Sequence, residues 1–169
     1  MNYQSLIRDI PDYPKPGIVF KDLTGIWKDP VAHRTSAKEI AEHFRSEGIT
    51  KVAAAEARGF ITGSLVAAEL GAGFLPVRKP GKLPWDTISE TYQLEYGTDT
   101  LEMHIDAVQA GDRVLLVDDL VATGGTLSAM VRMIRRQGGE AVAVAAIVSL
   151  DFLNPEKMID IPVFALVHY

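Results

Sequence analysis

Two adjacent carboxylates, Asp118 and Asp119, directly follow the apolar run 114–117 (VLLV) and precede a small, hydroxylated and flexible loop at 122–126 (ATGGT). The glycines let a ligand approach the loop backbone closely, and the free N–H groups of a helix that begins there favour an anion. A phosphate fits such a loop best. Because the carboxylates would repel a phosphate, we expect them to contact another part of the same ligand, such as sugar hydroxyls or a hydrated Mg²⁺. The stretch therefore predicts a site for a sugar phosphate.

The elements on both sides of this stretch place it at the edge of a sheet. The run 114–117 has no polar interruption, which is typical of a central strand covered on both faces. Apolar residues then recur at helical spacing, at Leu127, Met130, Val131 and Ile134. Gly138 and Gly139 follow where this helix should end. The carboxylates and the loop would then lie between the carboxyl end of a strand and a helix N-terminus, where ligands bind in open α/β sheets.

The same alternation of strands and helices runs through the first half of the chain. Two short apolar runs predict strands, 51–55 (KVAAA) and 74–78 (FLPVR), and residues 60–70 (FITGSLVAAEL) predict a helix. Another helix is expected over 31–48, with Gly48 at its C-terminal cap. Its apolar face is formed by Ala37, Ile40, Ala41 and Phe44. This order predicts parallel βα units and therefore an α/β fold.

The alternation stops after residue 78. Residues 79–87 (KPGKLPWDT) contain two prolines and a glycine, which predicts an irregular, mobile loop. Apolar and polar residues then alternate over 92–96 and 101–105, on the two sides of the turn-like 97–99 (GTD). This pattern predicts a β-hairpin with one solvated face. The sequence has no internal repeat, low-complexity tract or interdomain linker, so a single domain is expected.

Composition and charge exclude several classes of function. The 169 residues are 47% hydrophobic, which is enough for the core of one domain. The absence of cysteine rules out disulfides, thiolate catalysis and cysteine-ligated metal centres, and the four histidines lack metal-ligand spacing. A net charge of −5 gives no general attraction to nucleic acid or to a membrane, so neither is an expected partner. With no long apolar run and no secretory signal, a soluble cytoplasmic protein is expected.

Other kinds of phosphate site fit the sequence less well. The P-loop pattern of a glycine, four residues and Gly-Lys-Ser/Thr does not occur. Residues 71–76 (GAGFLP) begin like a dinucleotide-binding fingerprint, but Pro76 occupies the third glycine position and a strand follows instead of a helix. Signalling domains that receive a phosphate also carry an acidic pair after an apolar strand. They do not require the glycine–threonine loop that follows the pair here.

The stretch 114–126 (VLLVDDLVATGGT) resembles the phosphoribosyl diphosphate (PRPP) signature of type I phosphoribosyltransferases. Further segments resemble the adenine phosphoribosyltransferases within that family and occur in the family's order: 11–24 (PDYPKPGIVFKDLT), 56–63 (EARGFITG), 78–84 (RKPGKLP) and 92–104 (YQLEYGTDTLEMH). The chain departs from the family in being slightly short, in its variable loop 79–87 and in its brief C-terminal end. The resemblance implies one domain, 1–169, with a central, mainly parallel, twisted sheet flanked by helices. A small N-terminal hood (1–30) would cover the base, and a β-hairpin lid (79–105) would cover the reaction.

The resemblance also implies a reaction. The phosphoribosyl group of PRPP would be transferred to N9 of adenine, giving AMP and diphosphate in purine salvage. Mg²⁺ would be carried by the diphosphate of PRPP with no direct protein ligand, and the protein would be a homodimer. Two alternatives are a related transferase for hypoxanthine, guanine or xanthine, and a PRPP-sensing regulator. A regulator would usually add a DNA-binding module or a basic face, and this sequence offers neither.

Roles for the phosphate and ribose ligands follow from the same resemblance. The 5′-phosphate would be held by Ala122, Thr123, Gly124, Gly125 and Thr126, and the ribose hydroxyls by Asp118 and Asp119. The diphosphate would be held by Ala57, Arg58, Gly59, Arg78, Lys79 and Lys82. The guanidinium of Arg58 offers a fixed fork of donors that suits phosphate oxygens. Without the resemblance, Arg58 would be an ordinary exposed residue at a helix start, and Arg78, Lys79 and Lys82 would belong to a flexible charged loop.

The resemblance assigns the base and the proton transfer to two other segments. Phe20 would stack on the purine, and the backbone of Val19 and Lys21 would donate to N1 and accept from the 6-amino group, which distinguishes adenine from 6-oxo purines. Phe20 could otherwise be a core residue. Glu95 would act as acid or base for a purine nitrogen, with Tyr96 packed beside it. Glu95 could otherwise be a solvated strand residue.

Overall fold

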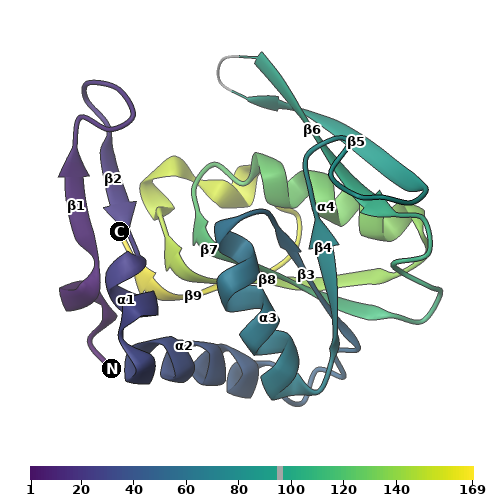
Figure 1. Ribbon diagram of the computed structural model, residues 1–169, viewed down its shortest axis with the longest axis horizontal. Coiled ribbons are helices and arrows are strands. Elements are labelled where there is room, and N and C mark those ends of the chain that lie inside the picture. The colour runs from purple at the N-terminus through teal and green to yellow at the C-terminus, as the bar shows by residue number, and fades with distance from the viewer. Residues whose placement is uncertain (95–96) are drawn as a thin grey trace.

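The computed structural model describes residues 1–94 and 97–169 and is built around a five-stranded sheet (Figure 1). The strand order is β4-β3-β7-β8-β9, and every pairing in this sheet is parallel. The strands are β3 (Lys51–Ala55), β4 (Gly73–Val77), β7 (Arg113–Val121), β8 (Glu140–Ser149) and β9 (Val163–His168). The expected α/β fold with a parallel sheet is confirmed.

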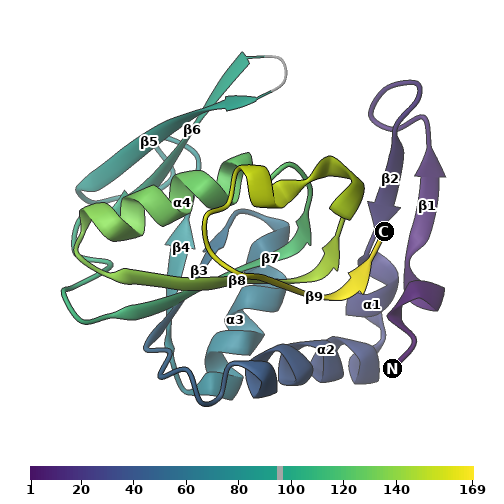
Figure 2. The same cartoon turned by 180° about the vertical axis from the view of Figure 1, so that it is seen from behind.

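Helices cover both faces of this sheet. One face carries α2 (Pro30–His43) and α3 (Arg58–Leu70), with the short α1 (Thr24–Lys28) beside them, and the other face carries α4 (Gly125–Arg136) (Figures 1 and 2). The short 3-10 helices are η1 (Tyr3–Leu6), η2 (Asp151–Leu153) and η3 (Pro155–Lys157). The sheet is thus the middle of three layers.

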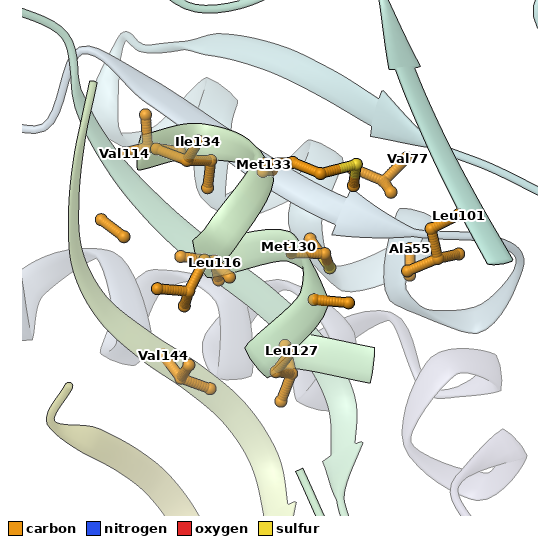
Figure 3. Packing of buried hydrophobic residues seen from close by; sticks show 14 of the residues in the cluster. Ala55, Val77, Leu101, Val114, Leu116, Leu127, Met130, Met133, Ile134 and Val144 are labelled. Carbon is orange, nitrogen blue, oxygen red and sulfur yellow. The ribbon is translucent and has the colours of Figure 1, made fainter. Parts of the chain in front are cut away.

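The central strand β7 packs into two separate hydrophobic cores. Val114 and Leu116 lie in the core under α4, whereas Leu115 and Val117 lie in the core under α2 and α3, and all four are fully buried. Successive side chains of a strand point to opposite faces, so a stretch covered on both sides, such as residues 114–117, is apolar at each position. Figure 3 shows the α4 side, where Leu127, Met130, Met133 and Ile134 face Val114, Leu116 and Val144 of the sheet.

Two antiparallel hairpins stand at opposite ends of the molecule (Figures 1 and 2). The first pairs β1 (Arg8–Pro11) with β2 (Val19–Asp22) and lies beside the C-terminus. The second pairs β5 (Thr87–Leu94) with β6 (Gly97–His104) and packs on α4. In the second hairpin Tyr92, Leu101 and Met103 are buried while Thr91 and Gln93 are exposed, so the expected hairpin with one solvated face is confirmed.

Several element boundaries differ from those predicted. The helix expected over 31–48 ends at His43, and Gly48 lies beyond it in a separate turn with a φ of +64°. Helix α3 begins at Arg58, two residues before the predicted start. Strand β7 continues to Val121, so Asp118 and Asp119 lie inside the strand and not beyond it. The ladder continues because Asp118 pairs with Ala146 of β8, and backbone pairing does not depend on side-chain polarity.

Candidate functional site

A cavity of about 230 Å³ lies where the carboxyl-end segments of β3 and β7 meet the β5–β6 hairpin and α4. Its lining includes residues from six parts of the chain: Ala55, Glu56, Ala57, Arg58, Gly59, Lys79, Tyr92, Asp99, Leu101, Asp118, Asp119, Leu120 and Thr126. Parallel strands that end side by side bring these distant segments to one edge of the sheet. The predicted ribose and diphosphate residues are therefore gathered around one space, with the exception of Arg78 and Lys82.

A second cavity of about 220 Å³ adjoins the first at the start of α4. Ala122 to Leu127 line it, and Arg58, Asp118, Leu120 and Thr126 line both cavities. Gly124 is the N-cap of α4, has a φ of +87° and has no side chain to cap the first turn. The N–H groups of that turn thus face the cavity without competition from a capping side chain. This geometry suits an anion such as a phosphate monoester.

Glycines bring helix α3 unusually close to the sheet at this site. A Cβ atom at Gly59 would lie 2.9 Å from Asp118 Oδ1, and a Cβ atom at Gly63 would lie 2.8 Å from Ala54 Cβ. The two glycines are four residues apart and therefore share one helix face. That spacing is the signal in the sequence by which this tight helix–sheet contact could have been predicted.

The carboxylate pair is largely withdrawn from solvent. Asp119 is 1% exposed and Asp118 is half-buried, and the Asp119 N–H donates to Asp118 Oδ1 at 2.8 Å. Burial, followed by the nearby negative charge of Asp119, raises the pKa of Asp118. Burial also raises the pKa of Asp119, although the positive charge of Arg58 opposes this. The Arg58 guanidinium Nε lies 3.2 Å from Asp119 Oδ2, so the arginine predicted to bind diphosphate is paired with a carboxylate of the same site.

The other predicted diphosphate residues differ in their position. Lys79 lines the first cavity, and its ammonium pairs with Asp99. Arg78 lies outside the lining and donates two hydrogen bonds to Glu56 Oε2, at 2.8 and 3.1 Å. Lys82 is exposed, and its carbonyl accepts from Arg78. A hydrogen bond from the Lys79 N–H, followed by those from Arg78, lowers the pKa of Glu56. Glu56 was not singled out in the sequence, because its partners Arg78 and Lys79 lie more than 20 residues further along the chain.

A third and more apolar cavity of about 610 Å³ lies between the β1–β2 hairpin and the C-terminal segment. The predicted base-binding residues Val19 and Lys21 line it together with Thr123. The opposite wall contains Leu150, Phe152, Leu153 and Tyr169, none of which was predicted. Phe152 is 66% exposed, and because exposure cannot be read from a sequence, no signal in the sequence pointed to this wall. Thr123 also lines the phosphate-type cavity, so the two spaces adjoin.

Phe20 lies next to these cavities without lining the third one. Its ring makes an edge contact with Tyr13, with 5.2 Å between centroids, and the Arg58 guanidinium carbon lies 5.2 Å from its centroid. Phe20 is half-buried and lies outside both hydrophobic cores, which leaves its predicted stacking role open. Glu95 and Tyr96 fall outside the described residues, so their predicted roles stay predictions.

The carboxylate oxygens of this site suit a Mg²⁺ ion that arrives bound to the phosphates of a ligand. Within residues 1–94 and 97–169, no group of three His, Cys, Asp or Glu side chains is arranged to hold a metal ion. Asp119 Oδ2 is buried and accepts no hydrogen bond from the described part of the chain. Mg²⁺ typically binds through one or two carboxylates together with substrate phosphates and water.

Among the described helices, none has the length and hydrophobicity needed to cross a membrane.

Comparison with known proteins gives concordant matches over nearly the whole chain. The family model of the phosphoribosyl transferase domain matches residues 30–166. An adenine phosphoribosyltransferase of Yersinia pestis (strain Pestoides F) is 58% identical over 150 residues, which cover 89% of this chain and 80% of that protein. The crystal structure of adenine phosphoribosyltransferase from Thermoanaerobacter pseudethanolicus superposes with a TM-score of 0.96 at 45% identity, covering 99% of this chain and 98% of that one. The Saccharomyces cerevisiae adenine phosphoribosyltransferase, complexed with adenine and an imino-altritol bisphosphate, gives a TM-score of 0.93 at 33% identity, covering 97% of this chain and 96% of that one.

Proposed function

Because the chain belongs to the phosphoribosyl transferase domain family, we propose that it transfers the 5-phosphoribosyl group of PRPP to N9 of adenine and releases AMP and diphosphate. The protein is an adenine phosphoribosyltransferase, a glycosyltransferase of purine salvage. The observation that carries this conclusion is the 58% identity to an adenine phosphoribosyltransferase over 89% of the chain. The three adjoining cavities support it, since a phosphate, a pentose with its diphosphate and a purine each have a chemically suitable space.

We assign the parts of PRPP to the first two cavities. The 5′-phosphate binds the loop 122–126 at the start of α4, where uncapped N–H groups and the hydroxyls of Thr123 and Thr126 are available. The ribose hydroxyls bind Asp118 and Asp119, which line the neighbouring space. The diphosphate binds the 57–59 loop and Lys79 on the far side of the carboxylates. Arg78 and Lys82 would reach it only if the loop after β4 moves.

Adenine occupies the third cavity in this proposal. Its volume of about 610 Å³ and its apolar walls suit a purine, and Thr123 connects it to the phosphate cavity. The backbone of Val19 and Lys21 selects the 6-amino purine. Phe20 forms the side of the base site that lies nearest to the Arg58 guanidinium. Phe152 and Leu153 form the opposite wall. The residues 1–30 thus act as the hood of a single domain, 1–169.

The reaction is a substitution at the anomeric carbon. Positive charge develops on the ribosyl group as diphosphate leaves, and the carboxylates of Asp118 and Asp119 stabilise it. When bound to PRPP, Mg²⁺ would neutralise negative charge on the leaving diphosphate. Arg58 and Lys79 hold that diphosphate, and the 79–105 lid excludes water that would hydrolyse PRPP. Glu95 handles a proton of the purine, and Tyr96 keeps the supporting role predicted for it. We further propose that the protein is cytoplasmic and forms a homodimer, and sedimentation of the purified protein would test the homodimer.

The test is product analysis with PRPP, Mg²⁺ and an equimolar mixture of adenine, hypoxanthine, guanine and xanthine. AMP should form first and in excess. Preferential formation of a 6-oxo nucleotide would support the related transferase and overturn the assignment of the hood. No nucleotide product at all, with PRPP still bound, would point to a PRPP-sensing regulator.

A further inference from the structure

A chain of polar contacts joins the β5–β6 hairpin to the start of α4. The Lys79 ammonium pairs with Asp99, Asp99 Oδ2 accepts a hydrogen bond from the Tyr92 hydroxyl at 3.3 Å, and the Tyr92 hydroxyl lies 3.0 Å from Thr126 Oγ1. All four side chains line the 230 Å³ cavity. Asp99 and Tyr92 have no role in the reaction described above.

The two ends of this chain coincide with the two anionic ends of PRPP. Lys79 is assigned to the diphosphate and Thr126 to the 5′-phosphate, so this inference rests on the proposed function. In the structure, hairpin side chains pair with both donors, Asp99 with Lys79 and Tyr92 with Thr126. Each phosphate must therefore replace a hairpin side chain as the partner of its donor.

We propose that Asp99 and Tyr92 are positioning residues that hold Lys79 and Thr126 against the hairpin until PRPP takes over both donors. The carboxylate of Asp99 then competes with the diphosphate for the same ammonium. Since Tyr92 donates to Asp99 and contacts Thr126, the release of one contact weakens the other. Binding at the two ends of PRPP is thereby coupled through the hairpin.

The exposure of the Lys79–Asp99 pair allows this exchange. The Lys79 and Asp99 side chains are 44% and 28% exposed, so water screens the pair and its rupture costs little. The hydrogen bond from Lys79, followed by that from the Thr100 N–H, lowers the pKa of Asp99, which is therefore ionised at neutral pH. Once Lys79 has turned to the diphosphate, Asp99 has lost its partner, so the Asp99 side chain must turn away from the ligand when the 79–105 lid covers PRPP.

The base of the hairpin is anchored separately. Glu90 pairs with Arg132 at 2.6 Å and with Arg136 at 3.0 Å, both on α4. The Glu102 N–H donates to the Arg78 carbonyl oxygen at 2.7 Å, and the Arg78 N–H donates to the Glu102 carbonyl oxygen at 3.0 Å. These contacts do not involve the residues assigned to the 5′-phosphate, so the hairpin stays attached at its base while the contacts nearer its tip are exchanged.

The test measures the binding of inorganic diphosphate with Mg²⁺, and of PRPP with Mg²⁺, by titration calorimetry. Asp99→Asn should bind diphosphate roughly two- to fivefold more tightly than the wild type, because a partly exposed competing ion pair has been removed. It should also lower the KM for PRPP and leave the KM for adenine unchanged. Tyr92→Phe should tighten PRPP binding, and the effects of the two substitutions should be less than additive, because the two residues share a contact.

Glu90→Gln is the matched control, since it makes the same carboxylate-to-amide change on the same hairpin but outside the cavity. It should lower the melting temperature without changing diphosphate affinity. Unchanged or weaker diphosphate binding by Asp99→Asn, while the wild type binds normally, would overturn the inference. If Asp99→Asn proves unstable, Asp99→Ser makes the same measurement. Failure of the wild type to bind either diphosphate or PRPP would instead reject the proposed function.

Discussion

Replacement of Gly59 by alanine tests whether the close approach of α3 to Asp118 is required by the site. A Cβ atom at residue 59 would lie 2.9 Å from Asp118 Oδ1 and 3.4 Å from the Val117 carbonyl oxygen. The Asp119 N–H holds that carboxylate oxygen at 2.8 Å, so either Asp118 or the first turn of α3 must move. An added methyl group in a packed interior costs about 1–3 kcal/mol, while the gain in helix propensity is at most about 1 kcal/mol. We expect a net destabilisation of about 1–2 kcal/mol.

Calorimetric melting should then show a fall in Tm of roughly 2–8 °C for a chain of this length. The KM for PRPP should rise because Asp118 is displaced from the ribose, whereas the KM for adenine should not change. Gly73→Ala is the matched control, since its nearest neighbour would be Lys51 Cγ at an ordinary 3.8 Å. If Gly59→Ala behaves like Gly73→Ala in both assays, the steric reasoning is refuted. A lower Tm with an unchanged KM for PRPP would refute the ribose-binding role of Asp118 alone.

Gly125→Val should weaken PRPP binding in calorimetry. A Cβ atom at residue 125 would already contact the Tyr92 ring at 3.5 Å, and the two methyl groups of valine would crowd the phosphate. Unchanged affinity would contradict the phosphate site. Asp118→Asn should raise the Tm at neutral pH while reducing activity. Burial raises the folded-state pKa of Asp118, so ionisation of this group opposes folding. The destabilisation is absent below the unfolded pKa of about 3.9 and grows as the pH rises from there to the folded-state pKa. The Tm gain should therefore disappear in acid, and a gain that persists there would have another cause. Glu95→Gln should lower kcat more than it changes PRPP affinity, and normal turnover would remove Glu95 from catalysis.

The sequence predicted the sheet well where a strand's environment is uniform along its length. The run 114–117 could be assigned because this part of β7 is buried on both faces and all four of its residues are apolar. The end of the same strand was misplaced because Asp118 and Asp119 continue the backbone ladder with polar side chains. The predicted end of helix α2 was five residues too late, because Phe44 remains buried after the helix has ended. The hydrophobic pattern of a sequence indicates which residues are buried. The backbone hydrogen bonds that define a helix or strand can end at a different residue.

The functional residues divide in a similar way. The loop 122–126 and the carboxylates before it are contiguous in the chain, so their chemistry could be interpreted from one short stretch. The contacts of Glu56, Tyr92 and Asp99 could not be identified, because each of these side chains pairs with a residue at least 20 positions away in the chain. The C-terminal wall of the third cavity was missed for the same reason, since it faces the N-terminal hairpin.

The pairing of charges in the first cavity explains how the site can prefer PRPP to simpler phosphates. Among the described residues that line it, Arg58 and Lys79 carry positive charge, and each is paired with a carboxylate, Asp119 and Asp99. An anion that takes either cation therefore leaves a carboxylate unpaired, which is most costly for the buried Asp119. Free phosphate cannot compensate for that loss. Under the proposed function, PRPP with Mg²⁺ could, because its ribose hydroxyls would offer partners to Asp119 and the metal ion on its diphosphate would offset the charge of Asp99. We therefore expect the affinity for PRPP to fall far more than the affinity for AMP when Mg²⁺ is removed.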